Sequence, residues 1–578
     1  SALLLASNSN PLTLGFDLGK TGASEKRIVS VNIHRNNKIR TCSDGRQVRI
    51  FAFLAKWDLS LLSGLGYGVC LPKNTKGLKQ NRVYKYFLRQ LNKKFCRGKE
   101  KNRFVKCCGM MYIVENKGRW GGIGRIEFTV NSAERQIIQN LRQKEEKTMA
   151  ATKYTETMFD QAELTALRAK FNYVDTDIKG RHRLFMDNAG GSLRLKAAEE
   201  AFKRVSEMPD ASEHSNELAL ELLALEDKAR ADIKHVIFGA ESGVIYPGYT
   251  ASQIIMDTAR IFGDHAKGTN YVTTVLEHPS SFDAMTYNAQ KHGCQLRVAQ
   301  ANPVTGGVDA DAVLSLIDKD TAVLSCMAAS NISGYVYDVE TICKKAREIN
   351  PDIFIICDAV QHAPHGVLDP ERLGVDMMHF APYKFFGVRG FALAWLSDRV
   401  AEFDHYRLLG KPKNDWEIGS PATAQFAAVQ QVIEYVVALG QVKNPDETNR
   451  RGLYAAGMKR IADHERGLLE LMLEGTEKMP GLRHMEGVTV QMDGKDLTTR
   501  DLILGIELAN IPSEVAVKEY DKRGVVAYDR SAGSIYSRRM LEAFGLKGVV
   551  RLSPLHVNSV EDIEEFLQIT EDMVEAVK

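Results

Sequence analysis

Residues 353–361 of the chain read IFIICDAVQ, and residues 381–384 read APYK. The apolar first half of the earlier segment predicts a buried strand that delivers a carboxylate, Asp358, at its C-terminal end. A second short apolar run, residues 377–380, predicts a strand followed by a turn that presents Lys384. Because ligands collect at the carboxyl edge of the strands in open α/β sheets, Asp358 and Lys384 are expected to face the same crevice.

This combination of a lysine and an aspartate suits one kind of cofactor chemistry. A lysine that forms a Schiff base and an aspartate that holds a pyridinium nitrogen are what pyridoxal phosphate requires. Either residue alone would more often be a solvated lysine or an acidic turn. Together at one predicted sheet edge, Lys384 and Asp358 favour the cofactor.

Strand-like and helix-like segments alternate from about residue 186 onward. The predicted strands of this part are 235–238, 271–276, 295–299, 322–327, 353–357, 377–380 and 391–396. Their alternation with helices predicts an α/β domain over 186–425, with a mainly parallel sheet and helices on both faces. An N-terminal arm over 149–185 is expected to precede it.

The C-terminal part reads differently. A long helical region runs to about residue 479, and short strands are predicted at 488–492, 502–508, 525–528 and 549–552. A final helix is predicted after Ser559, because Ser559 and Asp562 have capping-box spacing and an apolar stripe follows. We interpret residues 426–578 as a smaller α+β domain.

Charge is distributed unevenly along the 578 residues, whose net charge is only +3. Residues 1–148 hold 29 Lys and Arg against 10 Asp and Glu, whereas the remainder holds 47 against 63. We interpret residues 1–148 as a basic extension that is poorly ordered or not part of the native enzyme. On this interpretation the native enzyme starts at Met149. A basic face for nucleic acid is the weaker alternative.

Composition points to neither a membrane protein nor a disulfide-bonded one. The apolar stretch 48–71 is interrupted by Arg49, Lys56 and Asp58, and the N-terminus lacks the order of regions found in a secretory signal. The nine cysteines show neither a disulfide framework nor metal-ligand spacing. These features predict a cytoplasmic protein without a metal site.

Short motifs occur in a fixed order along the last two thirds of the chain. They are Asp187-Asn188-Ala189-Gly190, Gly248-Tyr249-Thr250-Ala251-Ser252, Glu277-His278, Ser330-Asn331 with Gly334, Asp358-Ala359-Val360-Gln361 with Pro364-His365, Gly419-Ser420-Pro421, and Arg551-Leu552-Ser553 with Asn558. In this order they resemble the class V aminotransferase family of fold-type I pyridoxal-phosphate enzymes, and within it the cysteine desulfurase-like proteins. The resemblance implies a small-molecule amino-acid substrate and a homodimer in which the segment 419–421 reaches the partner's cofactor.

The resemblance also implies a role for each matched residue. Lys384 would anchor the cofactor and move protons, Asp358 would keep the pyridine nitrogen protonated, and His278 would stack on the ring. The other implied cofactor contacts are Thr250, Ala251 and Ser252 at the phosphate, Asn331 and Gln361 at the phenolate oxygen, and Tyr383 and Ser420. Arg551 would hold the substrate carboxylate, and Arg389 an acidic group. The ordinary alternatives are a helix N-cap at 250–252, a structural histidine and surface arginines.

Two departures from the family pattern bear on the reaction. Many members carry Ser-x-His-Lys at the anchor, where this chain has Ala381-Pro382-Tyr383-Lys384. The loop in which desulfurases carry their nucleophilic cysteine corresponds to 528–537, and it contains none. Serine cannot form a persulfide, so a true desulfurase is disfavoured.

We therefore expect aminotransferase-like chemistry at the α-carbon of an amino acid. The alternatives are a desulfurase-like or other carbon–sulfur lyase, an epimerase, and a non-enzymatic scaffold that binds pyridoxal phosphate.

Overall fold

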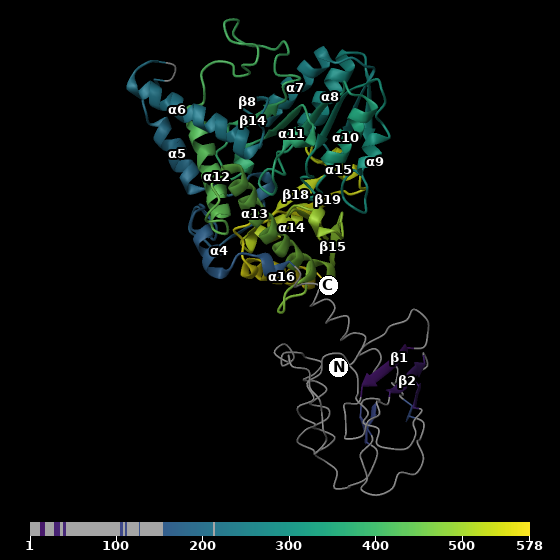
Figure 1. Ribbon diagram of the computed structural model, residues 1–578. Coiled ribbons are helices and arrows are strands. Elements are labelled where there is room, and N and C mark those ends of the chain that lie inside the picture. The colour runs from purple at the N-terminus through teal and green to yellow at the C-terminus, as the bar shows by residue number, and fades with distance from the viewer. Residues whose placement is uncertain are drawn as a thin grey trace. The chain divides into compact units, whose positions relative to one another are not determined.

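The chain forms two compact units, residues 1–147 and 148–578, as seen in a computed structural model (Figure 1). The structure describes residues 154–211 and 214–577, together with six short strands between residues 12 and 127. In the first unit, one sheet has the order β1-β2-β3-β6 and a second pair is β4-β5. Their bounds are Leu12–Asp17, Ile28–His34, Lys38–Thr41 and Ile126–Glu127 for the sheet, and Val105–Cys107 and Met110–Tyr112 for the pair. The rest of the predicted basic extension lies outside the described residues, so its interpretation stays a prediction.

A seven-stranded sheet forms the centre of the second unit, in the order β10-β9-β11-β12-β13-β14-β8. The strands are β8 (Val244–Gly248), β9 (Asn270–Thr274), β10 (Gln295–Ala299), β11 (Thr321–Met327), β12 (Phe354–Asp358), β13 (Met377–Phe380) and β14 (Ala392–Leu396). The first five in spatial order are parallel, whereas β14 is antiparallel to both β13 and β8. The predicted mainly parallel sheet is therefore confirmed, and β8 runs in the same direction as β13.

One strand prediction was wrong. Residues 235–238 are helical, because α6 (Glu217–Asp232) continues into the π-helical turn Ile233–Ile237. Ala229, Ile233 and Ile237 are all buried at a spacing of four, which is a helical rather than an alternating pattern. The strand of this region is instead β8, which the sequence reading missed.

Helices cover the sheet. They are α5 (Lys196–Ser206), α7 (Ala251–His265), α8 (Pro279–Lys291), α9 (Ala310–Leu314), α10 (Val339–Ile349), α11 (Pro370–Leu373), α12 (Thr423–Gln441) and α13 (Arg450–Glu474). Helix α12 packs against α5, α6 and α13, and α7 packs against α8, so two groups of helices flank the strands (Figure 1). Among the described residues, no helix is long and apolar enough to cross a membrane.

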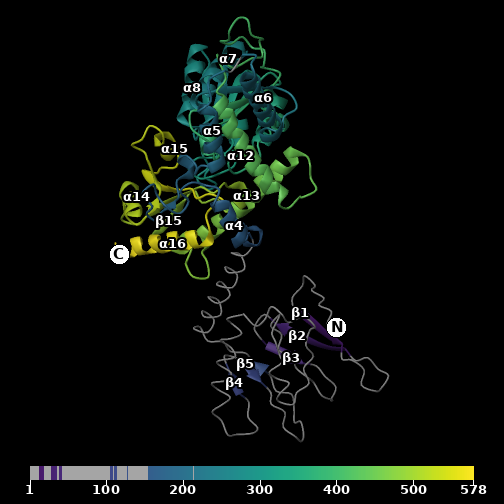
Figure 2. The ribbon, with the colours of Figure 1, turned by 90° about the vertical axis from the view of Figure 1, so that its left-hand side faces the viewer.

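The C-terminal elements build a second, smaller sheet with the order β15-β16-β19-β18. Its strands are Val488–Gln491, Leu504–Leu508, Gly548–Leu552 and Tyr528–Ser531, and its helices are α14 (Ser513–Lys522), α15 (Arg538–Glu542) and α16 (Val560–Glu575). Figure 2 shows α14, α15, β15 and α16 gathered at one end of this unit. Ser559 and Asp562 form the capping box that begins α16, which confirms that prediction.

The start of the second unit is tied to its C-terminal part. After α4 (Gln161–Arg168), β7 (Leu184–Phe185) pairs in parallel with β17 (Val525–Val526). Asp187, just beyond β7, then forms a bridge with Ser553, just beyond β19. This pairing places Asp187 beside the end of the strand that carries Arg551.

Candidate functional site

Asp358 and Lys384 meet at the carboxyl edge of the large sheet. Asp358 is the last residue of β12, and Lys384 ends the short 3-10 turn Pro382–Lys384 that follows β13, the neighbouring strand. Lys384 Nζ donates a hydrogen bond of 3.4 Å to Gln361 Oε1. The structure thus brings together the two residues that the sequence placed at one edge.

The Asp358 carboxylate is buried among hydrogen-bond donors and a neighbouring histidine. Its Oδ1 accepts a 3.0 Å hydrogen bond from the Val360 N–H and lies 3.2 Å from His379 Nε2, while Ser281 Oγ donates to Oδ2 at 3.2 Å. Burial alone would raise the pKa of Asp358, but His379 and the backbone donor hold that pKa well below its ordinary value. Asp358 is therefore an anion in the site. His379 was missed by the sequence reading, although a histidine within an apolar strand was a usable signal.

Lys384 is enclosed among charged neighbours. Its enclosure, and then the positive charge of Arg551, lower the pKa of Lys384 from the ordinary 10.5 to about 8, and Asp358 partly opposes them. A substantial fraction of Lys384 is consequently a neutral amine near neutral pH. A neutral amine is the form of lysine that acts as a nucleophile or a base.

His278 forms the N-cap of α8. Its Nδ1 accepts a 3.2 Å hydrogen bond from the Ser280 N–H and lies 2.7 Å from Ser280 Oγ. Burial lowers the pKa of His278 to about 4, so the ring is neutral. Its ring centroid lies 6.2 Å from that of Tyr536, which belongs to the segment that follows β18.

The N-terminus of α7 lies at the same sheet edge. Because β8 is parallel in direction to β13, the residues after Gly248 emerge where Asp358 and Lys384 do. Thr250 is the N-cap of α7, and its hydroxyl accepts a 3.0 Å hydrogen bond from the Gln253 N–H. Ala251 and Ser252 form the first turn. The first N–H groups of a helix and its positive end attract phosphate.

Arg551 already has partners within the chain. Its Nη2 lies 2.5 Å from Asp187 Oδ1, and its Nη1 donates to the Asn331 carbonyl oxygen at 3.2 Å. Asn331 Oδ1 in turn accepts a 3.4 Å hydrogen bond from Arg530. Asn331 therefore contacts two buried arginines. Neither Asp187 as a partner of Arg551 nor Arg530 was singled out from the sequence.

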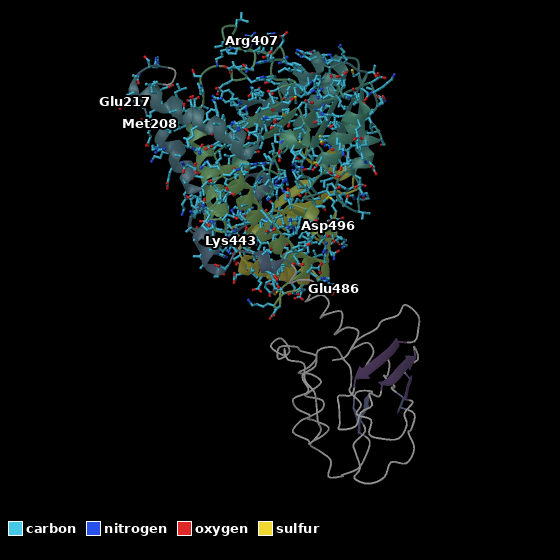
Figure 3. All side chains as sticks on the ribbon, viewed as in Figure 1. Met208, Glu217, Arg407, Lys443, Glu486 and Asp496 are labelled. Carbon is cyan, nitrogen blue, oxygen red and sulfur yellow. The ribbon has the colours of Figure 1, made fainter. Side chains whose placement is uncertain are left out.

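The remaining predicted residues are more exposed. The Arg389 guanidinium lies over the Tyr383 ring at 4.0 Å from the ring centre. Ser420 is exposed and lies in the segment between β14 and α12, the segment to which Arg407, labelled in Figure 3, also belongs.

No thiol of the described residues is placed to act as a nucleophile. Cys326 and Cys357 are buried and paired in register on β11 and β12, and Cys343 is buried on α10. A hydrogen bond with Cys326, followed by burial, raises the pKa of Cys357 well above its ordinary value, and burial does the same to Cys343. Burial also raises the pKa of the partly buried Cys294. All three of these thiols stay protonated at neutral pH.

The fold and site define a class of enzyme: an α/β protein with a lysine and an aspartate at the carboxyl edge of its sheet. The Aminotransferase class-V family profile matches residues 184–566, and the chain belongs to this family. Members of the family are pyridoxal-phosphate-dependent enzymes, and pyridoxal phosphate is the cofactor of this chain as well.

Similar proteins carry two kinds of name. A probable cysteine desulfurase of Streptomyces coelicolor is 26% identical over 57% of this chain and 80% of its own length. The aminotransferase-like protein FGM3 of Gibberella zeae is 23% identical over 67% of this chain and 94% of its own. A solved cysteine desulfurase of Thermococcus onnurineus superimposes with a TM-score of 0.59 at 20% identity, covering 68% of this chain and 95% of that one. The structural likeness supports the fold-type I architecture.

Proposed function

We propose that the chain acts at the α-carbon of a small-molecule amino acid, with Lys384 as the residue that holds the cofactor and moves the proton. One observation carries this proposal: an enclosed lysine with a pKa of about 8 stands beside an ionised, buried aspartate at the carboxyl edge of the sheet. A solvent-exposed lysine would be almost wholly protonated at neutral pH and unsuited to either task.

The side chains present fit pyridoxal phosphate. When bound, this cofactor supplies an electron sink that makes the α-proton of an amino acid acidic. In our proposal the anionic Asp358 holds the pyridine nitrogen in its protonated form, and the neutral His278 packs against the ring. Thr250, Ala251 and Ser252 receive the phosphate at the start of α7, where main-chain N–H groups point outward. Gln361 lies next to Lys384 and can orient its amino group.

We assign the substrate carboxylate to Arg551, which is buried close enough to Lys384 to influence its charge. The ion pair between Arg551 and Asp187 has to open or be shared when a carboxylate arrives. Arg389 and Tyr383 form a stacked pair, and we propose that Tyr383 borders the cofactor while Arg389 meets an acidic group at the entrance.

Two outcomes of the α-carbon chemistry each have one observation in their favour. Amino-group transfer is favoured by the side chains, because it needs no reactive thiol. In the described part of the chain, Cys357, Cys343 and Cys294 have raised pKa values and stay protonated. Carbon–sulfur bond cleavage is favoured by the comparisons, because several of the similar proteins are named probable cysteine desulfurases. We propose amino-group transfer first and carbon–sulfur cleavage second.

Product analysis separates the two outcomes. Purified protein loaded with pyridoxal phosphate would be incubated with a panel of amino acids, with and without a 2-oxo acid acceptor. Conversion that depends on the acceptor supports amino-group transfer. Alanine formed from cysteine together with a persulfide trapped on one of the cysteines would establish desulfuration instead.

Borohydride reduction followed by peptide mapping tests the assignment of Lys384. The cofactor should be recovered covalently on the peptide that contains Lys384, and Lys384→Ala should lose both this label and all turnover. Attachment to another lysine would show that the site is assigned incorrectly. Lys203, an exposed lysine on α5, supplies the control variant Lys203→Ala, which should keep label and activity.

We also propose a homodimer in the cytoplasm. The segment 404–422 exposes several large apolar side chains, namely Tyr406, Leu408, Leu409 and Ile418, and these would be covered by a second copy. Cys294, Cys326, Cys343 and Cys357 are free thiols, as expected in a reducing compartment. Light scattering should give the mass of two chains, and cell fractionation should recover the protein with the soluble pool. A monomer that binds the cofactor at full occupancy would contradict a site shared through Ser420.

A further inference from the structure

Arg530 is a buried arginine whose charge has no direct counterion. Only 5% of the residue is exposed. Its Nη2 makes long contacts with Asn331 Oδ1 at 3.4 Å and the Tyr536 carbonyl oxygen at 3.4 Å, and its Nε has no hydrogen-bond partner. Among the residues that the structure describes, no carboxylate forms an ion pair with it. Buried charges normally have a partner, because leaving one unpaired is costly.

Strand register puts Arg530 and Arg551 on the same face of the small sheet. Strands β18 and β19 are antiparallel, with Tyr528 opposite Arg551 and Arg530 opposite Val549. Since side chains alternate along a strand, Tyr528 and Arg530 point the same way, and Arg551 points the same way as Tyr528. The two arginines are thus diagonal neighbours, a relation in which residues lie roughly 7–8 Å apart. The Arg551 guanidinium is also 4.9 Å from the centre of the Tyr528 ring.

The charges around Lys384 do not balance in the protein alone. Lys384 faces Asp358, and Arg551 is paired with Asp187, whereas Arg530 adds a third positive charge to the same enclosure. Burial, then the neighbouring Arg551, lowers the pKa of Arg530 to about 9, although Tyr528 and Asp187 oppose this shift without forming an ion pair with Arg530. The charge of Arg530 also influences Lys384 and His278. Arg530 still has no anion in direct contact, and a second carboxylate on the substrate would supply one.

We propose that Arg530 binds a second carboxylate of the substrate, so that the enzyme acts on an α-amino acid with an acidic side chain. The inference rests on the proposed function, in which Arg551 receives the α-carboxylate. The guanidinium groups of Arg551 and Arg530 lie on one face of the sheet, and both contact Asn331. In this proposal Arg551 binds the α-carboxylate and Arg530 binds the side-chain carboxylate of a dicarboxylic amino acid. A neutral side chain would give Arg530 no carboxylate in direct contact, and this difference is the source of the selectivity.

Binding of an unreactive ligand tests the anion site without requiring turnover. Calorimetry on the cofactor-loaded protein would compare succinate with its monoamide, which differ only in one charge. We expect succinate to bind about 10- to 100-fold more tightly. Arg530→Gln should remove this preference and Arg530→Lys should retain part of it. Arg538→Gln should leave it intact, because Arg538 is an exposed arginine on the same segment.

The cofactor content of each variant is measured in the same samples. Arg530→Gln should bind as much pyridoxal phosphate as the unaltered protein. If Arg530→Gln keeps the full preference for succinate, Arg530 is not an anion site. If Arg530→Gln loses the cofactor instead, Arg530 belongs to the cofactor site and the proposal is overturned.

Kinetics then distinguish failure of this inference from failure of the proposed function. The ratio of kcat/KM for aspartate over asparagine, and for glutamate over glutamine, should exceed about 10 for at least one pair and collapse in Arg530→Gln. Turnover of neutral amino acids as fast as acidic ones would refute the inference and leave α-carbon chemistry standing. Absence of turnover with every amino acid would refute the proposed function, and the calorimetry would still decide the role of Arg530.

Discussion

A measurement of the pKa of Lys384 is the most demanding test of the proposed active site. With a pKa of about 8, the lysine is neutral in roughly 10% of molecules at pH 7, whereas at the ordinary value of 10.5 the neutral form would be about 0.03%. The structure therefore predicts a roughly 300-fold gain in nucleophilic amine at pH 7. The sign follows from the causes: enclosure and the positive charge of Arg551 favour the neutral form, and Asp358 opposes them.

Competitive acetylation with a trace of anhydride measures this quantity at one residue. The cofactor-free protein is labelled between pH 6 and pH 11, and peptide mass spectrometry follows Lys384, with exposed Lys203 as internal reference. The midpoint for Lys384 should lie near 8. Arg551→Gln should raise it and Asp358→Asn should lower it, while Arg538→Gln should leave it unchanged. A midpoint near 10.5, or a shift of the two variants in the same direction, would refute the electrostatic account.

Three further predictions concern stability. Gly457→Ala should cost about 1–3 kcal/mol, because a Cβ at this position would collide with the Val436 carbonyl oxygen where α12 and α13 pack, and an unchanged thermal midpoint would contradict this. Ser559→Ala should cost about 1 kcal/mol by removing the N-cap of α16, and Ser559→Asp, which keeps an acceptor, should restore most of it in the same thermal assay. Burial alone would lower the pKa of His365, but Glu465, 2.7 Å away, raises it to about 9. The stabilisation from this pair is therefore complete below pH 6.5 and lost as the pH rises through 9, so the thermal midpoint should fall over that range, and His365→Gln should flatten the fall.

Local sequence patterns were sufficient to predict most of the strands and the sheet edge at which Asp358 and Lys384 lie. The apolar run before Asp358 and the short strand before Lys384 are strands in the structure, and both residues lie where parallel strands end. The prediction failed at residues 235–238, where a four-residue apolar run was ambiguous. The buried spacing of Ala229, Ile233 and Ile237 shows that the run belongs to a helix.

Contacts between segments far apart in the chain could not be predicted from local sequence patterns. Asp187 reaches Arg551 only because β7 pairs with β17 and the chain then crosses to the end of β19. The family resemblance implied that Arg551 binds the substrate carboxylate, but the sequence gave no sign that the Asp187 carboxylate lies beside it. Ser281 escaped notice for the same reason, since it donates to Asp358 from α8.

The sequence by itself determined the α/β class, the edge at which Asp358 and Lys384 meet, and the absence of a cysteine from 528–537. These depend on periodicity and on residue identity, which are local properties. Only the tertiary structure decided that Lys384 is partly neutral, that Asp358 is ionised although buried, and that Arg530 and Arg551 share one face. Burial and strand register set these properties, because the charge of a side chain depends on which groups surround it in space, and those groups come from segments far apart in the chain.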